Sequence, residues 1–167
     1  MKKYHYFVEG KCEKKLLNVL KEQKNLIISG KVEVLNVIQE RLTELKLRPI
    51  SSGTIIILVF DTDVPKIDIL KDNLSILAKC SRFKDVWCVM QIPNLEGEIK
   101  KSTNLRDIKG LFDSEDMQSF KKDFICEKNL YKKLCDKGFD ISKIWTSSPS
   151  KAFEWLKNDG EKIKQKC

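Results

Sequence analysis

Thr-Ile-Ile-Ile-Leu-Val-Phe at residues 54–60 runs straight into Asp61, Thr62 and Asp63. An unbroken apolar run of this length, rich in β-branched residues and bounded by polar ones, predicts a β-strand. Both faces of the strand are apolar, so both must be covered, which is typical of a central strand in a parallel sheet. Residues 54–60 therefore predict an α/β fold in which helices cover both faces of the sheet.

The segments on either side of this strand alternate between strand and helix patterns. Short branched or aromatic runs predict strands, and apolar residues three and four apart predict helices. An alternating order predicts a four-stranded, mostly parallel sheet, because parallel neighbours need a crossover between them. We expect further strands at residues 4–8, 32–37 and 85–91, and helices from about Leu16, at 37–45 and at 65–77.

The second part of the chain has a less regular, mainly helical pattern. We expect one domain, with an α/β core at residues 1–92 and a mainly helical extension at residues 93–167. Trp145 and Trp155 are large apolar residues of this extension and are expected to anchor it in the core. Apolar spacing predicts helices in the extension at residues 108–112, 120–134 and 152–163.

The composition is that of a soluble, basic protein. The chain has 167 residues, of which 41% are hydrophobic, and a formal net charge of +8. No apolar run approaches the roughly 20 residues of a membrane helix, and no signal peptide is recognised, so a cytoplasmic protein is expected. Positive charge favours a polyanionic partner such as DNA or RNA, although solvated lysines would give the same composition. Zinc is not expected, because the six cysteines form no CxxC pair and His5 is the single histidine.

Acidic residues follow the first and third predicted strands. Glu9 ends the first strand, Glu13 lies four residues later, and Asp61 and Asp63 follow the third. The carboxyl ends of parallel strands meet at one edge of the sheet, where open α/β sheets place their sites. Carboxylates gathered there repel one another unless a cation neutralises them, and oxygen ligands suit Mg²⁺ or Mn²⁺. The sequence therefore predicts a site for two such ions, while a turn or helix cap remains the alternative for Asp61 and Asp63.

Two of these segments resemble the motifs of Toprim domains. Phe-Val-Glu-Gly-Lys-Cys-Glu at residues 7–13 looks like their VEGxxE opening, and Val-Phe-Asp-Thr-Asp, ending at Asp63, looks like their DxD strand end. The resemblance covers about residues 4 to 90. It implies a Toprim-like three-layer α/β sandwich with Glu9 closest to the scissile phosphate, as metal ligand or general base. It also implies that the metal ligands include Glu9, Glu13, Asp61 and Asp63.

Two later segments are similar to parts of the OLD-type (overcoming lysogenization defect) and RloB-like Toprim nucleases. Pro-Asn-Leu-Glu-Gly-Glu-Ile at residues 93–99 is similar to an acidic segment that supplies a further metal-binding Glu. Ser-Phe-Lys-Lys-Asp-Phe at residues 119–124 is similar to the segment that carries their active-site lysine. The resemblance implies that Glu96 is a metal ligand, with Glu98 left as the alternative. It also implies that Lys121 or Lys122 offsets negative charge in the transition state.

The function implied by the resemblance is that of a Mg²⁺- or Mn²⁺-dependent nuclease that cleaves DNA or RNA, with a role in defence against phage or plasmids. Topoisomerases and primases usually have a third acid two residues after the DxD motif. This chain has Pro65 there, so it departs from their pattern. The chain has no G-x-x-x-x-G-K-[ST] phosphate loop, so it either acts alone or has a separately encoded ATPase as partner. Two alternatives stay open: an RNA-processing or primase-like Toprim enzyme, and a non-catalytic nucleic-acid-binding or regulatory subunit. Assembly into a homo-oligomer is also left open.

Overall fold

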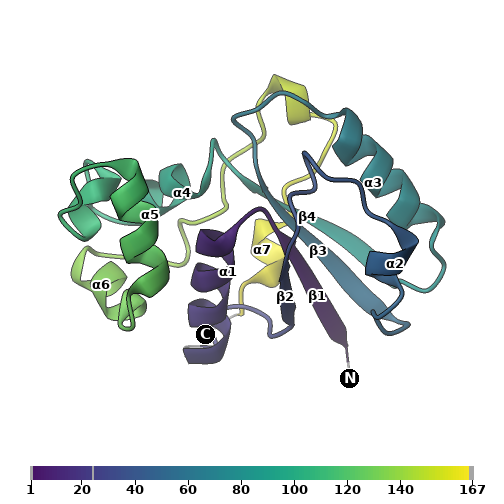
Figure 1. Cartoon of the computed structure of the whole chain (residues 1–167), viewed down its shortest axis with the longest axis horizontal. Coiled ribbons are helices and arrows are strands. Elements are labelled where there is room, and N and C mark those ends of the chain that lie inside the picture. Colours follow the sequence, from purple (N-terminus) through teal and green to yellow (C-terminus); the bar gives the residue numbers. More distant parts are fainter. Residues whose placement is uncertain (1, 24, 166–167) are drawn as a thin grey trace.

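A single parallel sheet forms the centre of the molecule (Figure 1). The structure is a computed structural model that describes residues 2–23 and 25–165. Within this part of the chain, four strands lie in the order β2-β1-β3-β4, and each neighbouring pair is parallel. The predicted strands are confirmed, and the sheet is parallel throughout. The strands are β1 (Lys3–Val8), β2 (Lys31–Val34), β3 (Thr54–Asp61) and β4 (Asp85–Gln91).

Both faces of β3 are buried, as its apolar sequence predicts. Ile57 and Val59 belong to the core on one face, and Leu58 and Phe60 belong to the core on the other. Helix α1 (Lys11–Asn18) covers the first face together with most of the extension, and α3 (Asp68–Lys79) covers the second (Figure 1). This arrangement confirms the predicted α/β sandwich with helices on both sides of the sheet.

The helix predicted at residues 37–45 is wrong. Residues 37–40 form a turn and a bend instead, residues 41–43 are irregular, and the short helix α2 (Glu44–Leu47) follows. Asn73 of α3 is fully buried, accepts the N–H of Leu42 at 2.7 Å and donates to the carbonyls of Val37 and Glu40 at 2.9 and 2.8 Å. Its side chain therefore satisfies backbone groups that a helix would pair internally, so the apolar residues of this segment are buried without forming a helix.

The extension contains shorter elements than its sequence predicts. The predicted helix at residues 120–134 is two helices, α5 and α6, interrupted at residues 127–129. In the α/β core, the helix predicted at residues 65–77 is α3, which begins only at Asp68. The elements of the extension are α4 (Leu95–Ser102), the 3-10 helix η2 (Ile108–Leu111), α5 (Met117–Cys126), α6 (Leu130–Asp136), the 3-10 helix η3 (Lys151–Phe153) and α7 (Gly160–Ile163).

The helix predicted at residues 152–163 is also wrong, because this segment runs along the outer edge of β4. Asn158 Oδ1 accepts the N–H of Met90 at 3.1 Å, and Asp159 exchanges two hydrogen bonds with the backbone of Cys88, at 3.0 and 2.7 Å. These contacts satisfy edge-strand groups that would otherwise be open to another chain. Trp155 is 45% exposed in this segment, so it is not the core anchor that the sequence predicts.

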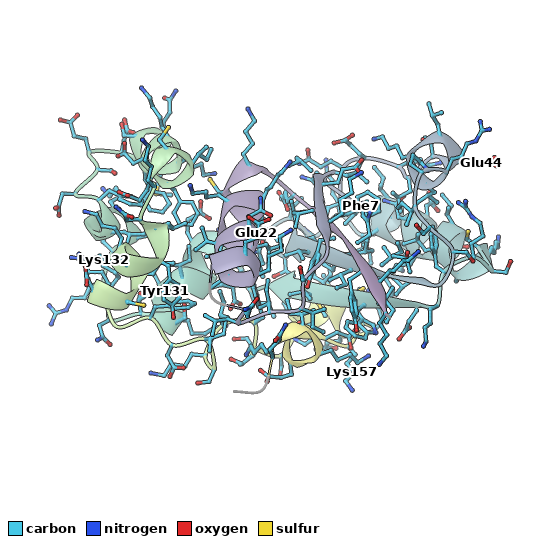
Figure 2. All side chains as sticks on the ribbon, turned by 90° about the horizontal axis from the view of Figure 1, so that it is seen from below. Phe7, Glu22, Glu44, Tyr131, Lys132 and Lys157 are labelled. Atoms are coloured by element: carbon cyan, nitrogen blue, oxygen red, sulfur yellow. The ribbon has the colours of Figure 1, made fainter. Side chains whose placement is uncertain are left out.

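The helices of the extension share a core with the sheet. Phe120 and Phe124 of α5 and Leu134 of α6 are buried in the same cluster as Tyr6 of β1. Trp145 is 1% exposed and belongs to this cluster, as predicted. Figure 2 shows α6, with Tyr131 and Lys132, at the end of the molecule away from α2. None of the helices described in residues 2–23 and 25–165 is long and apolar enough to cross a membrane.

Candidate metal centre

The strand order places the ends of β1 and β3 at a topological switch point. The chain leaves β1 towards β2 on one side, and it leaves β3 towards β4 on the other. In open α/β sheets, the crevice outside the carboxyl ends of two such strands is the usual place for a ligand. Glu9 follows the last residue of β1, and Asp61 is the last residue of β3. Both acids therefore lie at the position where the fold itself opens a crevice.

The side chain of Glu9 contacts the backbone of Asp61 directly. Glu9 Oε2 accepts the N–H of Asp61 at 3.1 Å. Asp61 Oδ1 in turn accepts the N–H of Leu95, the first residue of α4, at 3.1 Å. The two hydrogen bonds join the ends of β1 and β3 to the start of α4, so these three segments form one side of a common site.

A pocket of about 480 Å³ lies at this edge of the sheet. Its wall includes residues from the loop after β1, from α1, from the end of β3, from α4 and from α5. The charged residues that line it are Glu9, Lys11, Glu13, Asp61, Glu96 and Lys121. Four carboxylates and two ammonium groups thus come together from segments that are far apart in the sequence. We call this the acidic pocket.

Gly10 leaves room for the carboxylate of Glu13 beside the acidic pocket. Gly10 caps the amino end of α1, and Glu13 lies in the first turn of that helix. A Cβ atom at position 10 would stand 3.0 Å from Glu13 Oε2, which is closer than ordinary van der Waals contact. Negative charge is favourable near the amino end of a helix. The Glu-Gly-x-x-Glu spacing therefore brings both glutamates to the same place without a steric conflict.

Burial and the neighbouring acids disfavour the ionisation of Asp61 and Glu13. Burial raises the pKa of Asp61 to about 9, with further contributions from the negative charges of Glu9, Glu13, Asp63 and Glu96. Burial also raises the pKa of Glu13, and the charges of Glu9 and Glu96 add to this effect. The lysines of the pocket do not compensate the accumulated negative charge at Asp61. A divalent cation would remove this penalty, because it favours the ionised form of each carboxylate around it.

The chemistry of the donor set fits Mg²⁺ or Mn²⁺, which prefer carboxylate oxygens. Glu9 and Asp61 each give one oxygen to a backbone N–H and have a second oxygen for a ligand. As the side chains stand, no three His, Cys, Asp or Glu residues in the described part of the chain are grouped closely enough to hold one ion. The assignment of Glu9, Glu13, Asp61, Asp63 and Glu96 as ligands therefore stays a prediction.

Lys121 and Lys122 have different positions relative to the acidic pocket. Lys121 lines it, and its Nζ lies 3.6 Å from Glu96 Oε1. The negative charge of Glu96 raises the pKa of Lys121, so this side chain is held as a cation. Lys122 is exposed and is not among the residues that line the pocket. The structure thus brings Lys121 to the candidate site and leaves Lys122 on the surface.

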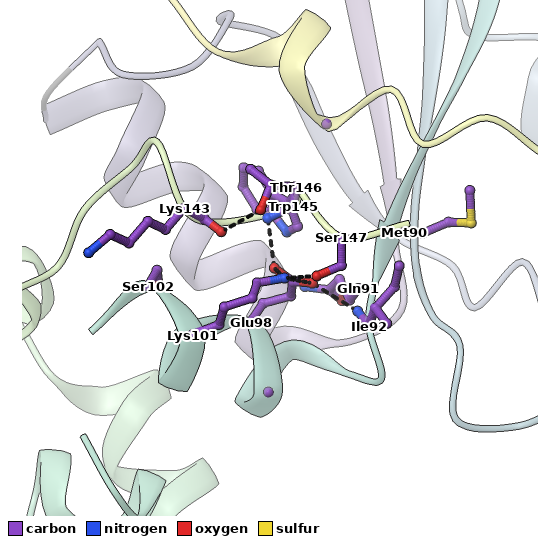
Figure 3. A network of polar contacts seen from close by, with 12 residues as sticks. Met90, Gln91, Ile92, Glu98, Lys101, Ser102, Lys143, Trp145, Thr146 and Ser147 are labelled. Atoms are coloured by element: carbon purple, nitrogen blue, oxygen red, sulfur yellow. Dashed lines mark hydrogen bonds and ion pairs between the residues drawn. The ribbon is translucent and has the colours of Figure 1, made fainter. Parts of the chain in front are cut away.

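The three other acids of the predicted set are also separated by the structure. Glu96 lines the acidic pocket, whereas Glu98 is completely buried and bonds to the backbone N–H groups of Ile92 and Trp145 (Figure 3). Asp63 is exposed and lies outside the pocket lining, although its charge is close enough to raise the pKa of Asp61. The pocket therefore contains Glu96 rather than Glu98, and Asp63 stands outside it.

Three polar residues of the pocket are not predicted from the sequence. Lys11 follows Gly10 directly, and Asn36 and Gln39 come from the segment after β2. β2 is parallel to β1, so its carboxyl end also reaches the edge of the sheet that carries the acids. Glu9 and Asp61 are predicted from the rule that sites lie at the carboxyl ends of parallel strands. The same rule, applied to the end of the second strand, would have predicted Asn36.

Among residues 2–23 and 25–165, the cysteines do not form a cluster with His5. Cys12, Cys80, Cys88, Cys126 and Cys135 are free thiols, and Cys167 lies outside the described residues. His5 is 3% exposed in β1, with its Nε2 3.4 Å from Glu33 Oε2. His5 therefore belongs to the interior of the sheet and lines no part of the acidic pocket.

No protein-family model, no curated protein and no solved structure matches this chain. The Toprim resemblance therefore depends on the motifs at residues 7–13 and 59–63. The geometry of the acidic pocket is independent of that resemblance, because it follows from the strand order and from the contacts of Glu9, Asp61 and Leu95.

Proposed function

We propose that the chain is a Mg²⁺- or Mn²⁺-dependent nuclease of the Toprim type that cleaves phosphodiester bonds in DNA or RNA. The observation that carries this proposal is the acidic pocket, in which four carboxylates meet Lys121 at the switch point between β1 and β3. Its position, its donor chemistry and the raised pKa of Asp61 support a cation-binding role. A cytoplasmic location and a role in defence with a separately encoded ATPase belong to the same proposal.

Each residue of the acidic pocket has a role in this proposal. Glu9, Glu13, Asp61 and Glu96 would hold the cations, with Asp63 at the margin. Bound Mg²⁺ or Mn²⁺ supplies an activated water molecule and neutralises charge on the phosphate oxygens. The Lys121 ammonium, from α5, lies beside Glu96 and would offset the negative charge that develops on the phosphate as the phosphodiester bond breaks. The net charge of +8 attracts a polyanionic substrate towards a site that is itself acidic.

A second candidate function is that of a non-catalytic nucleic-acid-binding or regulatory subunit. The observation that favours it is the absence, among the described residues, of three acids grouped closely enough to hold one ion. In that case the acidic pocket would not bind Mn²⁺ strongly, and the chain would bind nucleic acid through its lysines without cleaving it.

Removal of divalent cations distinguishes the two functions. The full chain is incubated with supercoiled plasmid, single-stranded DNA and structured RNA, with Mg²⁺ or Mn²⁺ and with EDTA. We expect cleavage of at least one substrate with Mn²⁺, its loss in EDTA and its return when Mn²⁺ is added back. Binding without cleavage, together with a melting temperature that does not respond to Mn²⁺, would support the non-catalytic subunit instead.

Replacing Lys121 with methionine should lower the cleavage rate on the order of 10²-fold, because a cation that faces the reacting phosphate is lost. Lys122→Met is the matched control, since Lys122 is an exposed neighbour on the same helix. Its cleavage rate should stay within about twofold of the unmodified chain. Single-turnover cleavage at saturating substrate measures both rates. Equal rates for the two variants would remove Lys121 from the proposed chemistry.

A further inference from the structure

Glu98 is a fully buried acid that joins three segments of the chain (Figure 3). Its Oε1 accepts the N–H of Ile92, just after β4, at 2.9 Å. Its Oε2 accepts the N–H of Trp145 at 2.6 Å. Lys101, one turn further along α4, places its Nζ 2.9 Å from the same carboxylate and also donates to Ser147 Oγ at 2.7 Å. The carboxylate thus links α4, the end of β4 and the segment around Trp145.

The partners of Glu98 explain why this position carries a carboxylate. All three are donors, and they use both carboxylate oxygens. A glutamine has one acceptor oxygen, and its NH₂ group would face another donor. An isolated buried carboxylate is costly, but here two backbone N–H groups and the Lys101 ammonium compensate it. One of these N–H groups belongs to Trp145, whose backbone has a φ of 57°, a conformation that is uncommon for a bulky residue.

Glu96 and Glu98 project from opposite sides of α4. Two positions along an α-helix correspond to a rotation of about 200°. Buried Glu98 therefore faces the interior while Glu96 lines the acidic pocket. The first residue of the same helix, Leu95, donates its N–H to Asp61 Oδ1 at 3.1 Å. The first turn of α4 thus carries one acid of the pocket and contacts a second, and Glu98 anchors this turn from the interior.

The end of β3 restrains the same segment from a second direction. Thr62 donates its N–H to the carbonyl of Pro93 at 2.7 Å, and its hydroxyl donates to the carbonyl of Gln91 at 3.0 Å. The residues between β4 and α4 are therefore held by Thr62 on one side and by Glu98, through Ile92, on the other. This double attachment fixes where α4 begins relative to Asp61.

We propose that Glu98 is a positioning residue for the acidic pocket, because it fixes the orientation of α4 so that Glu96 and Asp61 can share a divalent cation. The inference rests on the proposed function, since it requires that the acidic pocket binds a cation. Glu98 itself does not line the pocket. A buried acid that only stabilised the fold would change the free energy of unfolding and leave the affinity for the cation unchanged. A positioning residue changes that affinity as well.

The test compares Glu98→Gln with Asp159→Asn in the full chain. Asp159 is a matched control because it is also a buried carboxylate, 8% exposed, that accepts a backbone N–H from Cys88 and pairs with Lys162. It lies along the edge of β4 and does not line the acidic pocket. The affinity for Mn²⁺ is measured by calorimetry and by the rise in melting temperature with Mn²⁺ concentration.

We expect Glu98→Gln to weaken the binding of Mn²⁺ by about 10- to 100-fold, the usual cost of losing a group that orients metal ligands. Cleavage by this variant should recover as Mn²⁺ is raised, so the cation concentration for half-maximal rate shifts by a similar factor. Asp159→Asn should lower the melting temperature without Mn²⁺ and bind Mn²⁺ as the unmodified chain does. Lys101→Met retains Glu98 and removes its ammonium partner, so it should show a smaller shift in the same direction.

Three results would overturn parts of this inference separately. If the unmodified chain binds no Mn²⁺, the proposed function fails and the positioning role fails with it. If the unmodified chain binds Mn²⁺ and Glu98→Gln binds it as tightly as Asp159→Asn, only the positioning role is wrong. If Glu98→Gln does not fold, Lys101→Met is used as the test instead. An affinity of Lys101→Met for Mn²⁺ equal to that of the unmodified chain would then contradict the inference.

Discussion

Replacing Asp61 with asparagine should abolish cation-dependent cleavage and raise the melting temperature of the cation-free protein at pH 8. Asparagine retains an oxygen that can accept the N–H of Leu95, so the backbone contact at Asp61 Oδ1 can persist. At pH 8 the unfolded chain has an ionised Asp61, which must take up a proton to be buried beside the other acids, whereas asparagine is neutral in both states and avoids this cost. Cleavage is lost because a proposed ligand at the centre of the acidic pocket is gone.

The pH dependence of stability follows from the raised pKa of Asp61. The carboxyl titrates near 3.8 in the unfolded chain, whereas burial and the neighbouring acids raise its pKa to about 9 in the folded protein. Between these values the folded state holds a proton that the unfolded state has lost, so stability falls as the pH rises from about 4 to about 9. The loss is at most about 1.4 kcal/mol per pH unit for one such group.

Thermal melts from pH 5 to pH 9, with and without Mn²⁺, measure both parts of this prediction. For the cation-free protein, the melting temperature of the unmodified chain should fall more steeply with pH than that of Asp61→Asn. Mn²⁺ should raise the melting temperature of the unmodified chain at high pH and change that of Asp61→Asn little. Asp85→Asn is the control, because Asp85 begins β4 at the opposite edge of the sheet. A large destabilisation of cation-free Asp61→Asn at pH 8 would instead make Asp61 a structural residue.

Replacing Phe124 with alanine should destabilise the whole protein by about 3–5 kcal/mol, the usual cost of removing a buried aromatic ring. Phe124 is fully buried in the core that β1 and β3 share with the extension. Its ring lies 5.7 Å from that of Phe120 and 6.2 Å from that of Phe112, measured between centroids. The loss therefore affects the sheet as well as α5.

Urea unfolding followed by far-UV circular dichroism and by tryptophan fluorescence tests this prediction. Both signals should show one coincident transition, shifted to lower urea in Phe124→Ala, because the sheet and the helices of the extension share one hydrophobic cluster. Met117→Ala is the control on the same helix, since Met117 is 38% exposed and its replacement should cost about 0.5 kcal/mol or less. Two separate transitions, with only one of them sensitive to Phe124→Ala, would mean that the extension is a domain of its own.

The sequence predicts the strands of this fold well because their signals are local. An apolar run such as residues 54–60 can be buried in few ways, and parallel strands leave a characteristic alternation with helices. The two wrong helix predictions have a common cause. Residues 37–45 and 152–163 have apolar residues at helical spacing. In the first segment, backbone groups bond to the side chain of Asn73, and in the second, the N–H of Asp159 bonds to the carbonyl of Cys88 in β4. A local pattern contains no information about such partners.

The candidate site shows the same limit at the level of single residues. Strand ends predict that Glu9 and Asp61 meet, because the topology alone brings them together. The choice between Glu96 and Glu98, or between Lys121 and Lys122, depends on which side of a helix faces the pocket. That side is set by the packing of α4 and α5 against the rest of the molecule, so adjacent residues of the same type cannot be distinguished in the sequence.

The acidic pocket is assembled from parts of the chain that are synthesised at widely different times. Glu9 contacts the backbone of Asp61 across 52 positions, and Asp61 contacts that of Leu95 across another 34. Lys121 comes later still, on a helix that must first dock against α1. Long-range contacts of this kind form late in folding, after the entropy of closing large loops has been overcome. A growing chain therefore has no complete pocket until Lys121 has been synthesised and α5 has docked against α1.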